Sequence, residues 1–356
     1  MKVTIVGSGF MGSAMAWPLN DRGHDVQLVG THLDADIIAS CKETRIHPKL
    51  KRELPKNVQP FYIEEIEQAL DGADLILSGV NSLGVHWIGK KIGPYLRPGQ
   101  AVLAITKGLE CDNDGNLRIL PDVLAEEFPA DVRDRVTCAA VGGPCIAAEL
   151  AGRRDTSVMF GCRDAAMAKE IAGIFRTDYY HIWPTDDLVG LEVCAALKNA
   201  YTLGIGLAEG FLDRSGGVDE AGAHMYNIAA STFAQSTVEM DRMLQIMGGT
   251  RDLAYGLPGA GDLYVTTQGA RTVRLGRLLG KGHTLTEARE IMAGETLEAA
   301  EIIREVGTAL PKLEERGLVG DDDLPLMRAL IRIIVNEEIL ESLPLDAYFH
   351  DMPAHL

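Results

Sequence analysis

The chain has 356 residues, which exceeds a typical single domain and predicts two domains. Its 46% hydrophobic and 24% charged residues are typical of a globular protein, and a formal net charge of -17 argues against nucleic acid or an anionic membrane surface as a partner. The sequence contains no run of about 18 uncharged apolar residues, so we predict no membrane span. The six scattered cysteines contain no C-x-x-C pair and indicate reduced thiols in a cytoplasmic protein.

The N-terminal segment has the pattern of a dinucleotide-binding unit. The apolar run Lys2–Val6 predicts a strand and leads directly into a G-x-G-x-x-G turn, whose residues are Gly7, Ser8, Gly9, Phe10, Met11 and Gly12. A helical stretch from Ser13 and a second strand, Asp25–Val29, follow at the spacing of a βαβ unit. Glycines at these positions let the backbone approach a pyrophosphate, and the start of the helix supplies N–H groups. We therefore predict nucleotide binding, because a tight turn without a ligand would not explain three glycines at this spacing.

Short β-rich runs alternate with helical patterns over the rest of the first half. Further strands are predicted at Leu75–Leu77, Val102–Ile105, Thr137–Ala140, Ser157–Phe160 and Tyr180–Ile182. Helices are predicted between them at Ile63–Leu70, Gly84–Ile92 and Ala165–Phe175. This alternation predicts an α/β fold with a Rossmann-type, doubly wound and mostly parallel sheet.

The pattern changes from about Asp186, where long helical segments dominate and β-branched runs almost vanish. These helices are predicted at Leu188–Ala208, Ala221–Met247, Leu285–Met292, Thr296–Glu305 and Leu324–Glu338. We therefore predict an all-helical C-terminal domain for substrate binding and catalysis at residues 185–356. It follows a dinucleotide-binding domain at residues 1–184, and the two are joined near Trp183-Pro184-Thr185.

The end of the second strand bears on the choice between NAD and NADP. An NAD-preferring site has an acidic residue there, about 20 residues after the glycines, which holds the ribose 2′-hydroxyl. Here the segment is Gly30-Thr31-His32, and the first acid is Asp34. Without a carboxylate nothing at this spot repels a 2′-phosphate, and Thr31 or His32 is able to donate to one, although no arginine is present to clamp it. We predict NAD or NADP with tolerance of NADP; taken alone, His32 is better explained as an ordinary exposed loop histidine.

Two later strand ends also carry candidate residues. The small-residue turn Leu77–Ser82, which includes Val80, would let a nicotinamide or ribose lie across the strand ends. The segment Ile105–Gly108 places Lys107 on the same edge of the sheet, and Gly142–Cys145 follows another strand in the same way. A single lysine at a strand end is ordinarily a surface charge, so the significance of Lys107 depends on the residues that join it.

The helical half contains residues that are candidates to join Lys107 in a functional site. Lys198 lies on the largely apolar helix that starts at Leu188, where a lysine is seldom tolerated without a partner or a function. Asp262 stands in the Gly-rich segment Tyr255–Leu263, and Thr266 and Arg271 follow it. Taken singly, Asp262 is explained as a helix N-cap or turn residue, and Arg271 as a solvated helix residue.

Taken together and in order, these segments resemble the NAD(P)-dependent glycerol-3-phosphate dehydrogenase family. The family pattern joins the glycine fingerprint, a His-Pro segment, a K-G, a G-P-x-x-A-x-E, an E-x-x-x-A-L-K-N, and a G-x-x-G-x-G-D-L that leads to an Arg-Asn pair. The matching residues here are Gly7–Gly12, His47-Pro48, Lys107-Gly108, Gly143–Glu149, Glu192–Asn199, Gly256–Leu263 and Arg271. The resemblance covers nearly the whole chain, and its A-L-K-N and G-D-L segments are the most specific.

The resemblance implies hydride transfer between a nicotinamide and carbon 2 of sn-glycerol 3-phosphate or dihydroxyacetone phosphate, supplying glycerolipid synthesis. It implies Lys198 as the acid or base, with Lys107 and Asp262 as the other catalytic residues. The pocket for the small phosphorylated substrate would be lined by Lys107, Asn199, Thr266, Arg271 and Thr272. Besides the glycine turn, the residues implied at the cofactor are Thr31, His32, Val80, Lys107, Ala147, Arg271 and Glu298. The resemblance also implies a homodimer, and we predict no metal site.

Three positions depart from the family pattern. Thr272 follows Arg271 where the family has asparagine, Ala299 follows Glu298 where glycine is usual, and Cys145 replaces a serine or alanine. Because Thr272 is shorter and branched, it alters the phosphate end of the pocket and leaves open a related substrate, such as a four-carbon ketose phosphate. A non-catalytic NAD(P)H sensor is a further alternative. Such proteins tend to lose their acid–base residues, whereas Lys107, Lys198 and Asp262 are all present here.

Overall fold

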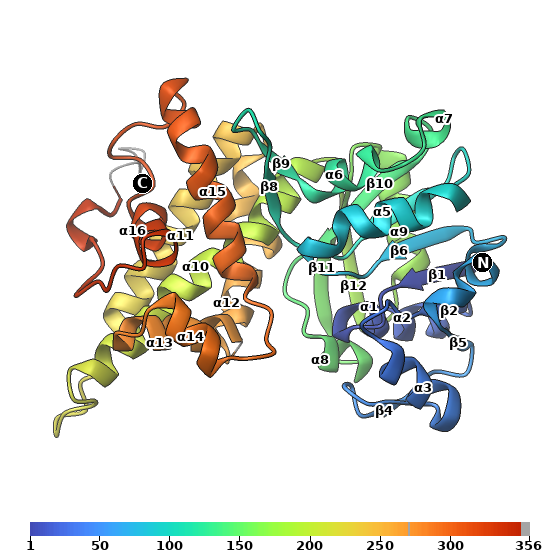
Figure 1. The fold of residues 1–356 in the computed structure, drawn as a ribbon, viewed down its shortest axis with the longest axis horizontal. Helices are drawn as coiled ribbons and strands as arrows, with labels where there is room; N and C mark the ends of the chain where they lie inside the picture. Colours follow the sequence, from blue (N-terminus) through green and yellow to red (C-terminus); the bar gives the residue numbers. More distant parts are fainter. Residues whose placement is uncertain (270, 350–356) are drawn as a thin grey trace. The chain divides into compact units, whose positions relative to one another are not determined.

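The computed structural model describes residues 1–269 and 271–349, and the chain divides into two units (Figure 1). The first unit comprises Met1–Lys107 and Ile119–Glu192, and the second comprises Gly108–Arg118 and the chain from Val193 onward. The main division therefore falls inside the helix α10 (Leu188–Arg214). The predicted linker Trp183–Thr185 instead completes strand β12 (Tyr180–Thr185), where it pairs with Met159–Gly161. The domain boundary at residues 184 and 185 stays a prediction.

An eight-stranded sheet of order β12-β11-β10-β7-β6-β1-β2-β5 forms the first unit. Its neighbouring strands are parallel except for β10 and β11. From β5 to β10 the spatial order is that of a doubly wound dinucleotide-binding sheet, which confirms the predicted fold class. The remaining strand bounds are β1 (Lys2–Val6), β2 (Asp25–Val29), β5 (Val58–Phe61), β6 (Leu75–Ser78), β7 (Ala101–Ala104), β10 (Thr137–Gly142) and β11 (Thr156–Cys162).

Helices cover both faces of this sheet. One face packs against α1 (Phe10–Ala14), α2 (Ala16–Asp21), α8 (Ala147–Ala151) and α9 (Ala165–Phe175). The other packs against α4 (Ile66–Leu70), α5 (Val85–Ile92) and α6 (Leu120–Glu126). Along β1, Ile5 belongs to the first hydrophobic cluster and Val6 to the second. Because the strand is buried on both faces, its sequence is mostly apolar, and the buried Thr4 hydroxyl donates to the Ala69 carbonyl oxygen at 2.7 Å. The helix α3 (Ala35–Thr44) also contributes Ile37 and Cys41 to the first cluster. The smaller elements are β3 (Ile46–His47), β4 (Arg52–Glu53), η1 (Ile63–Glu65), η2 (Ser82–Gly84), η3 (Gly93–Tyr95) and α7 (Ala130–Arg133).

Strand β5 is the element of this sheet that the sequence analysis missed. It is only four residues long and contains Pro60, whose ring removes a backbone donor. β5 lies at the edge of the sheet and pairs only with β2, with Leu28 opposite Pro60. An edge strand tolerates proline, so tertiary position explains a strand that local propensity does not predict.

From α10 onward the described chain is helical, as predicted. The helices are α11 (Tyr226–Met247), α12 (Asp262–Thr267), α13 (Arg271–Lys281), α14 (Leu285–Ile291), α15 (Glu298–Glu315) and α16 (Pro325–Val335), with short turns η4 (Arg251–Ala254), η5 (Leu257–Gly261) and η6 (Leu345–Ala347). The unit also takes residues 108–118 from the first half, which contain most of the hairpin β8 (Leu109–Cys111) and β9 (Leu117–Ile119). The Cys111 N–H donates to Glu305 Oε2 of α15 at 2.7 Å, so the helical unit includes a strand pair that the sequence analysis did not predict.

Two helices of the second unit cross at close range through glycines. A Cβ at Gly206 of α10 would lie 2.6 Å from the Val273 carbonyl oxygen, and one at Gly276 of α13 would lie 2.2 Å from the Leu203 carbonyl oxygen. Gly210 and Gly280 make equally close approaches one helical turn further on. This contact sets α13 against the helix that carries Lys198, and α13 itself was not predicted.

A buried carboxylate caps α16. Glu239 of α11 is fully buried and accepts hydrogen bonds from the backbone N–H groups of Leu326 at 2.6 Å and Met327 at 2.9 Å. Gln235 and Tyr201 donate to the same carboxylate. Burial raises the pKa of Glu239 to about 7, although these hydrogen bonds oppose the rise. Glu239 therefore satisfies N–H groups that the first turn of a helix otherwise leaves unpaired.

Within the described residues, α10 alone is long and apolar enough to meet the length and composition criteria of a membrane-spanning helix, with a mean hydropathy of 1.2. However, 94% of its apolar window is buried inside the protein.

Candidate functional site

The glycine turn lies where the strand order of the sheet reverses, between β1 and β6. A Cβ at Gly7 would lie 2.4 Å from the Gly79 carbonyl oxygen, and Gly7 has a φ of +117°. A Cβ at Gly12 would lie 2.2 Å from the Gly7 carbonyl oxygen. Both positions therefore exclude any side chain, and the turn is held against the end of β6. A crevice at such a reversal is where doubly wound sheets bind ligands.

Gly9 differs from the two other glycines of the turn. A Cβ added to Gly9 would meet nothing within 4 Å, so its missing side chain leaves open space in front of the backbone. Phe10 next to it is 53% exposed, whereas Met11 packs against the core. A partly exposed backbone flanked by two sterically required glycines is the form that approaches a pyrophosphate closely. The residues of the turn therefore fit a dinucleotide.

Ser8 is tied to two neighbouring segments. Its carbonyl oxygen accepts a hydrogen bond from His47 Nε2 at 3.1 Å, while His47 Nδ1 accepts from the Leu50 N–H at 3.1 Å. These roles define the neutral imidazole, and burial lowers the pKa of His47. The His-Pro segment thus anchors the glycine turn to the β3–β4 hairpin, a structural role that the motif alone did not reveal.

Asp34 also reaches the glycine turn. Its Oδ2 accepts from the Ser8 N–H at 3.3 Å, from the Thr31 N–H at 2.9 Å and from the Thr31 hydroxyl at 2.8 Å. The expectation that no carboxylate lies near the end of β2 is therefore wrong, because a loop of four residues folds Asp34 back onto the turn. His32 is exposed, and its ring meets Trp87 edge-on with centroids 5.3 Å apart.

The other predicted cofactor residues of the first unit follow strand ends. Val80 follows β6 and accepts a hydrogen bond from the Thr106 hydroxyl at 2.7 Å, which ties this strand end to the end of β7. Lys107 follows Thr106 directly and is half-buried. Ala147 begins α8, which packs against α1. The carboxyl edge of the sheet thus gathers the glycine turn, Val80 and Lys107 within one unit.

Lys198, Asp262 and Thr266 form one buried cluster in the second unit. Lys198 Nζ lies 2.9 Å from Asp262 Oδ1 and donates to Thr266 Oγ1 at 2.7 Å. The Thr266 hydroxyl donates to the Asp262 carbonyl oxygen at 2.6 Å, so it is an acceptor toward Lys198. The Lys198 side chain is 8% exposed and that of Asp262 is 2% exposed. Asp262 is therefore the counter-ion of Lys198, and the N-cap position of α12 is Gly261.

The Gly-rich segment brings Asp262 into position. Gly256–Gly261 forms a tight turn, and η5 within it is a single π-helical turn that ends where α12 begins. A Cβ at Gly259 would lie 2.1 Å from the Ala254 carbonyl oxygen, so this glycine is required for the close packing of η4 and η5. Wide helical turns of this kind are frequent at functional sites.

The remaining predicted substrate residues are also in the second unit. Arg271 at the start of α13 donates from Nη2 to Glu298 Oε1 at 3.0 Å, which joins two residues implied at the cofactor. Asn199 and Thr272 are both buried. Arg271 is thus paired with a carboxylate at the start of α15, and its side chain is 44% exposed, so its assignment to the phosphate stays a prediction.

Glu192 is a residue that the sequence analysis quoted within a motif but assigned no role. It is fully buried, and both of its carboxyl oxygens lack a hydrogen-bond partner among the described residues. A signal was present in the sequence, since Glu192 is flanked by apolar residues on α10 just as Lys198 is. The same reasoning that selected Lys198 therefore applies to Glu192.

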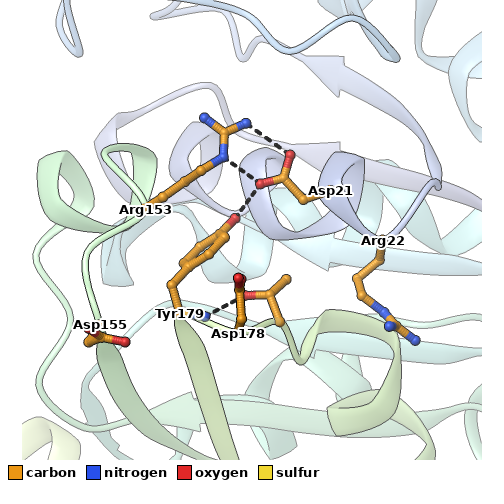
Figure 2. A pocket seen from close by; sticks show the side chains of 7 residues that line it. Asp21, Arg22, Arg153, Asp155, Asp178 and Tyr179 are labelled. Carbon is orange, nitrogen blue, oxygen red and sulfur yellow. Dashed lines mark hydrogen bonds and ion pairs between the residues drawn. The ribbon is translucent and has the colours of Figure 1, made fainter.

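A polar pocket of about 700 Å³ in the first unit involves none of the predicted site residues. Figure 2 shows Arg153 and Tyr179 both directed at Asp21. Arg153 Nε lies 2.6 Å from Asp21 Oδ2, and the Tyr179 hydroxyl donates to the same oxygen at 2.7 Å. Burial acts to raise the pKa of Asp21, but the hydrogen bonds from Arg153, Tyr179 and Asn20 outweigh it and lower the pKa. These charged groups are engaged with one another and hold the pocket wall together.

Side chains of His, Cys, Asp and Glu do not gather in groups of three or more able to hold a metal ion, within residues 1–269 and 271–349. All six cysteines are free thiols, of which Cys41, Cys162 and Cys194 are buried.

Comparison with known proteins gives matches along nearly the whole chain. The model of the NAD-dependent glycerol-3-phosphate dehydrogenase N-terminus matches residues 2–168, and the model of the C-terminus matches residues 187–344. The chain is 37% identical over 290 residues to the NADP(+)-dependent glycerol-3-phosphate dehydrogenase of Archaeoglobus fulgidus, covering 82% of the chain and 83% of the relative. It is 28% identical over 343 residues to glycerol-3-phosphate dehydrogenase [NAD(P)+] of Enterococcus faecalis, covering 96% and 93%.

Solved structures share the fold. The crystal structure of glycerol-3-phosphate dehydrogenase from Coxiella burnetii superposes with a TM-score of 0.77 at 23% identity, and the match covers 95% of each chain. The structure of the yeast glycerol-3-phosphate dehydrogenase superposes with a TM-score of 0.78 at 21% identity, covering 97% of each chain.

Proposed function

The chain belongs to the NAD-dependent glycerol-3-phosphate dehydrogenase family, and from this premise we propose that it reduces dihydroxyacetone phosphate to sn-glycerol 3-phosphate with Lys198 as the proton donor. It is an NAD(P)-dependent oxidoreductase with glycerol-3-phosphate dehydrogenase activity. The observation that carries the role of Lys198 is its buried cluster with Asp262 and Thr266.

The cluster suits Lys198 to move a proton. An ammonium group has three N–H donors, and two of them are directed at Asp262 and Thr266, which fixes the direction of the third. Asp262 supplies the negative charge that makes burial of the ammonium tolerable. In reduction Lys198 gives a proton to the ketone oxygen, and in the reverse direction it accepts the proton of the hydroxyl group. Lys107 adds a positive charge that stabilises negative charge developing on that oxygen.

The glycine turn holds the cofactor in this proposal, with Gly9 facing the pyrophosphate. When bound, the nicotinamide supplies the hydride or accepts it. We propose that both NADH and NADPH serve, and similarity to the NADP(+)-dependent enzyme of Archaeoglobus fulgidus supports tolerance of NADP. The N–H and the hydroxyl of Thr31 both donate to Asp34, so a 2′-phosphate would be recognised mainly by His32. Val80, Ala147 and Glu298 complete the proposed cofactor contacts.

Arg271 is proposed to bind the phosphate of the substrate. Its planar guanidinium offers paired donors that match phosphate geometry. Buried Asn199 and Thr272 would complete the polar lining. Because Thr272 replaces the asparagine of the family pattern, a four-carbon ketose phosphate is the alternative substrate.

The cellular setting belongs to the same proposal. We propose a homodimer in the cytoplasm that supplies glycerol 3-phosphate for glycerolipid synthesis. The six free cysteines are consistent with a reducing compartment. Size-exclusion chromatography with light scattering would give the mass of the particle directly.

Initial rates test the substrate and the role of Arg271 together. The purified protein should oxidise NADH or NADPH when dihydroxyacetone phosphate is added, and faster than with a four-carbon ketose phosphate or unphosphorylated dihydroxyacetone. Arg271→Ala should raise the KM for the phosphorylated ketone far more than the KM for the cofactor. Arg274→Ala is the matched control, because Arg274 lies on the same helix and pairs with Glu295 at 2.7 Å. Absence of turnover with dihydroxyacetone phosphate and both cofactors would refute the proposed function.

A further inference from the structure

Glu192 is a buried carboxyl group that neither the glycine turn nor the Lys198 cluster uses. It is the fifth residue of α10 and is 0% exposed, with neither oxygen hydrogen-bonded among the described residues. An ionised carboxylate that has left water without gaining donors is so unfavourable that the group takes up a proton instead. At neutral pH Glu192 is therefore an uncharged carboxylic acid.

Two charged groups act on Glu192 from the elements around it. Lys107, at the end of β7, exerts the strongest attraction, and Asp122 on α6 exerts a weaker repulsion. Asp122 is itself tied to Arg163, whose Nη1 donates to Asp122 Oδ1 at 2.6 Å. Burial raises the pKa of Glu192 to about 8, and attraction to Lys107 only partly opposes the rise. Glu192 thus changes its charge near pH 8, within the electrostatic influence of Lys107.

The contrast with Glu239 shows that burial alone does not explain Glu192. Glu239 is equally buried, but its oxygens accept hydrogen bonds from Leu326 and Met327, where it caps a helix. Among residues 1–269 and 271–349, no group donates a hydrogen bond to either oxygen of Glu192. A buried acid without donors that interacts electrostatically with a lysine proposed for catalysis has the pattern of a residue kept for its electrostatic effect.

Building on the proposed function, we propose that Glu192 is a positioning residue that acts through Lys107. As a buried neutral acid it adds no negative charge beside Lys107, so the positive charge of that lysine acts on the phosphorylated ketone. When Glu192 ionises and releases its proton to solvent, its negative charge offsets Lys107 and weakens the interaction with the substrate. Glu192 therefore sets the upper pH limit of ketone reduction.

The pH profile of kcat/KM for ketone reduction tests this inference. In the unaltered protein a single ionisation near pH 8 should lower kcat/KM about tenfold between pH 7 and pH 9. Glu192→Gln is a neutral isostere and should keep the activity measured at pH 7 while losing this decline. Glu192→Met should behave in the same way. Because methionine has neither a charge nor strong hydrogen-bonding groups, this variant separates the effect of charge from that of hydrogen bonding. It also replaces Glu192→Gln if that variant does not fold. Glu192→Asp retains the acid and should retain the decline.

Two controls connect the effect to Lys107. Glu239→Gln removes an equally buried acid elsewhere and should leave the pH profile of kcat/KM unchanged. In a Lys107→Met background, Glu192→Gln should have no further effect on the profile, because the lysine through which it acts is gone. Superimposable profiles for the unaltered protein and for Glu192→Gln would overturn the inference. So would a profile change that persists in the Lys107→Met background.

A stability measurement tests the charge state of Glu192 without any turnover. A carboxyl whose pKa is higher in the folded state contributes stability that is present below its unfolded value and lost as pH rises through its folded value. The free energy of unfolding of the unaltered protein, relative to Glu192→Gln, should therefore decline from pH 5 to pH 8. If turnover is absent but this decline is found, the proposed function has failed and the buried neutral acid stands. If turnover is present but the decline is not found, the inference fails.

Discussion

Replacing Asp262 with asparagine isolates the charge of the Lys198 cluster. Asparagine keeps the shape of the side chain and an acceptor oxygen, but it removes the negative charge 2.9 Å from Lys198 Nζ. Both side chains are almost wholly buried, at 8% and 2% exposure, so solvent does not screen the loss. Removing one partner of a buried ion pair costs about 3–5 kcal/mol. Since the amide oxygen still accepts a hydrogen bond, we expect Asp262→Asn to lower the free energy of unfolding by about 3 kcal/mol.

Turnover should fall as well, by about 100-fold or more, because the proton donor is no longer held in a fixed direction. Urea denaturation and initial rates with dihydroxyacetone phosphate measure the two effects. Asp241→Asn is the matched control: Asp241 is also buried, but its partner Arg251 is 52% exposed, so solvent replaces the lost interaction. The assignment of Asp262 as the buried counter-ion of Lys198 would be refuted if both substitutions lowered the free energy of unfolding equally and both variants retained turnover.

Two further substitutions test the framework of the helical unit. Gly276→Ala should destabilise the protein by about 1–3 kcal/mol in thermal denaturation, because its Cβ would lie 2.2 Å from the Leu203 carbonyl oxygen. Gly173→Ala on α9 meets nothing within 4 Å and should be neutral or stabilising; equal losses at both positions would contradict the close helix crossing. Glu239→Gln should remove a pH dependence of stability: burial raises the pKa of Glu239 to about 7, so its contribution is fully present below about pH 4.5 and declines as pH rises through 7. Parallel curves for the unaltered protein and Glu239→Gln between pH 4.5 and 7 would refute this assignment.

Seven of the eight strands of the sheet, the glycine turn and the family were predictable from the sequence. Buried parallel strands are continuous apolar runs and steric glycines have fixed spacing, so both leave a local record in the chain. Lys198 and Asp262 were identifiable because a lysine in an apolar helix and an acid in a Gly-rich turn are locally unusual. Their pairing was expected only from the resemblance, since the 63 residues between them carry no distance information.

Tertiary structure alone decided the features that depend on contacts distant in sequence. Strand β5 forms despite Pro60 because it lies at the sheet edge, and Asp34 folds back onto the glycine turn because Ser8 and Thr31 donate to it. The close approach of α13 to α10 was not predictable, because Gly206 and Gly276 meet carbonyl oxygens of residues far away in the sequence. The apolar residues that flank Glu192 signal its burial, but only the structure shows that its carboxyl group has no hydrogen-bond donor among the described residues. Whether a buried carboxyl has donors is a property of the packed interior, and no local pattern records it.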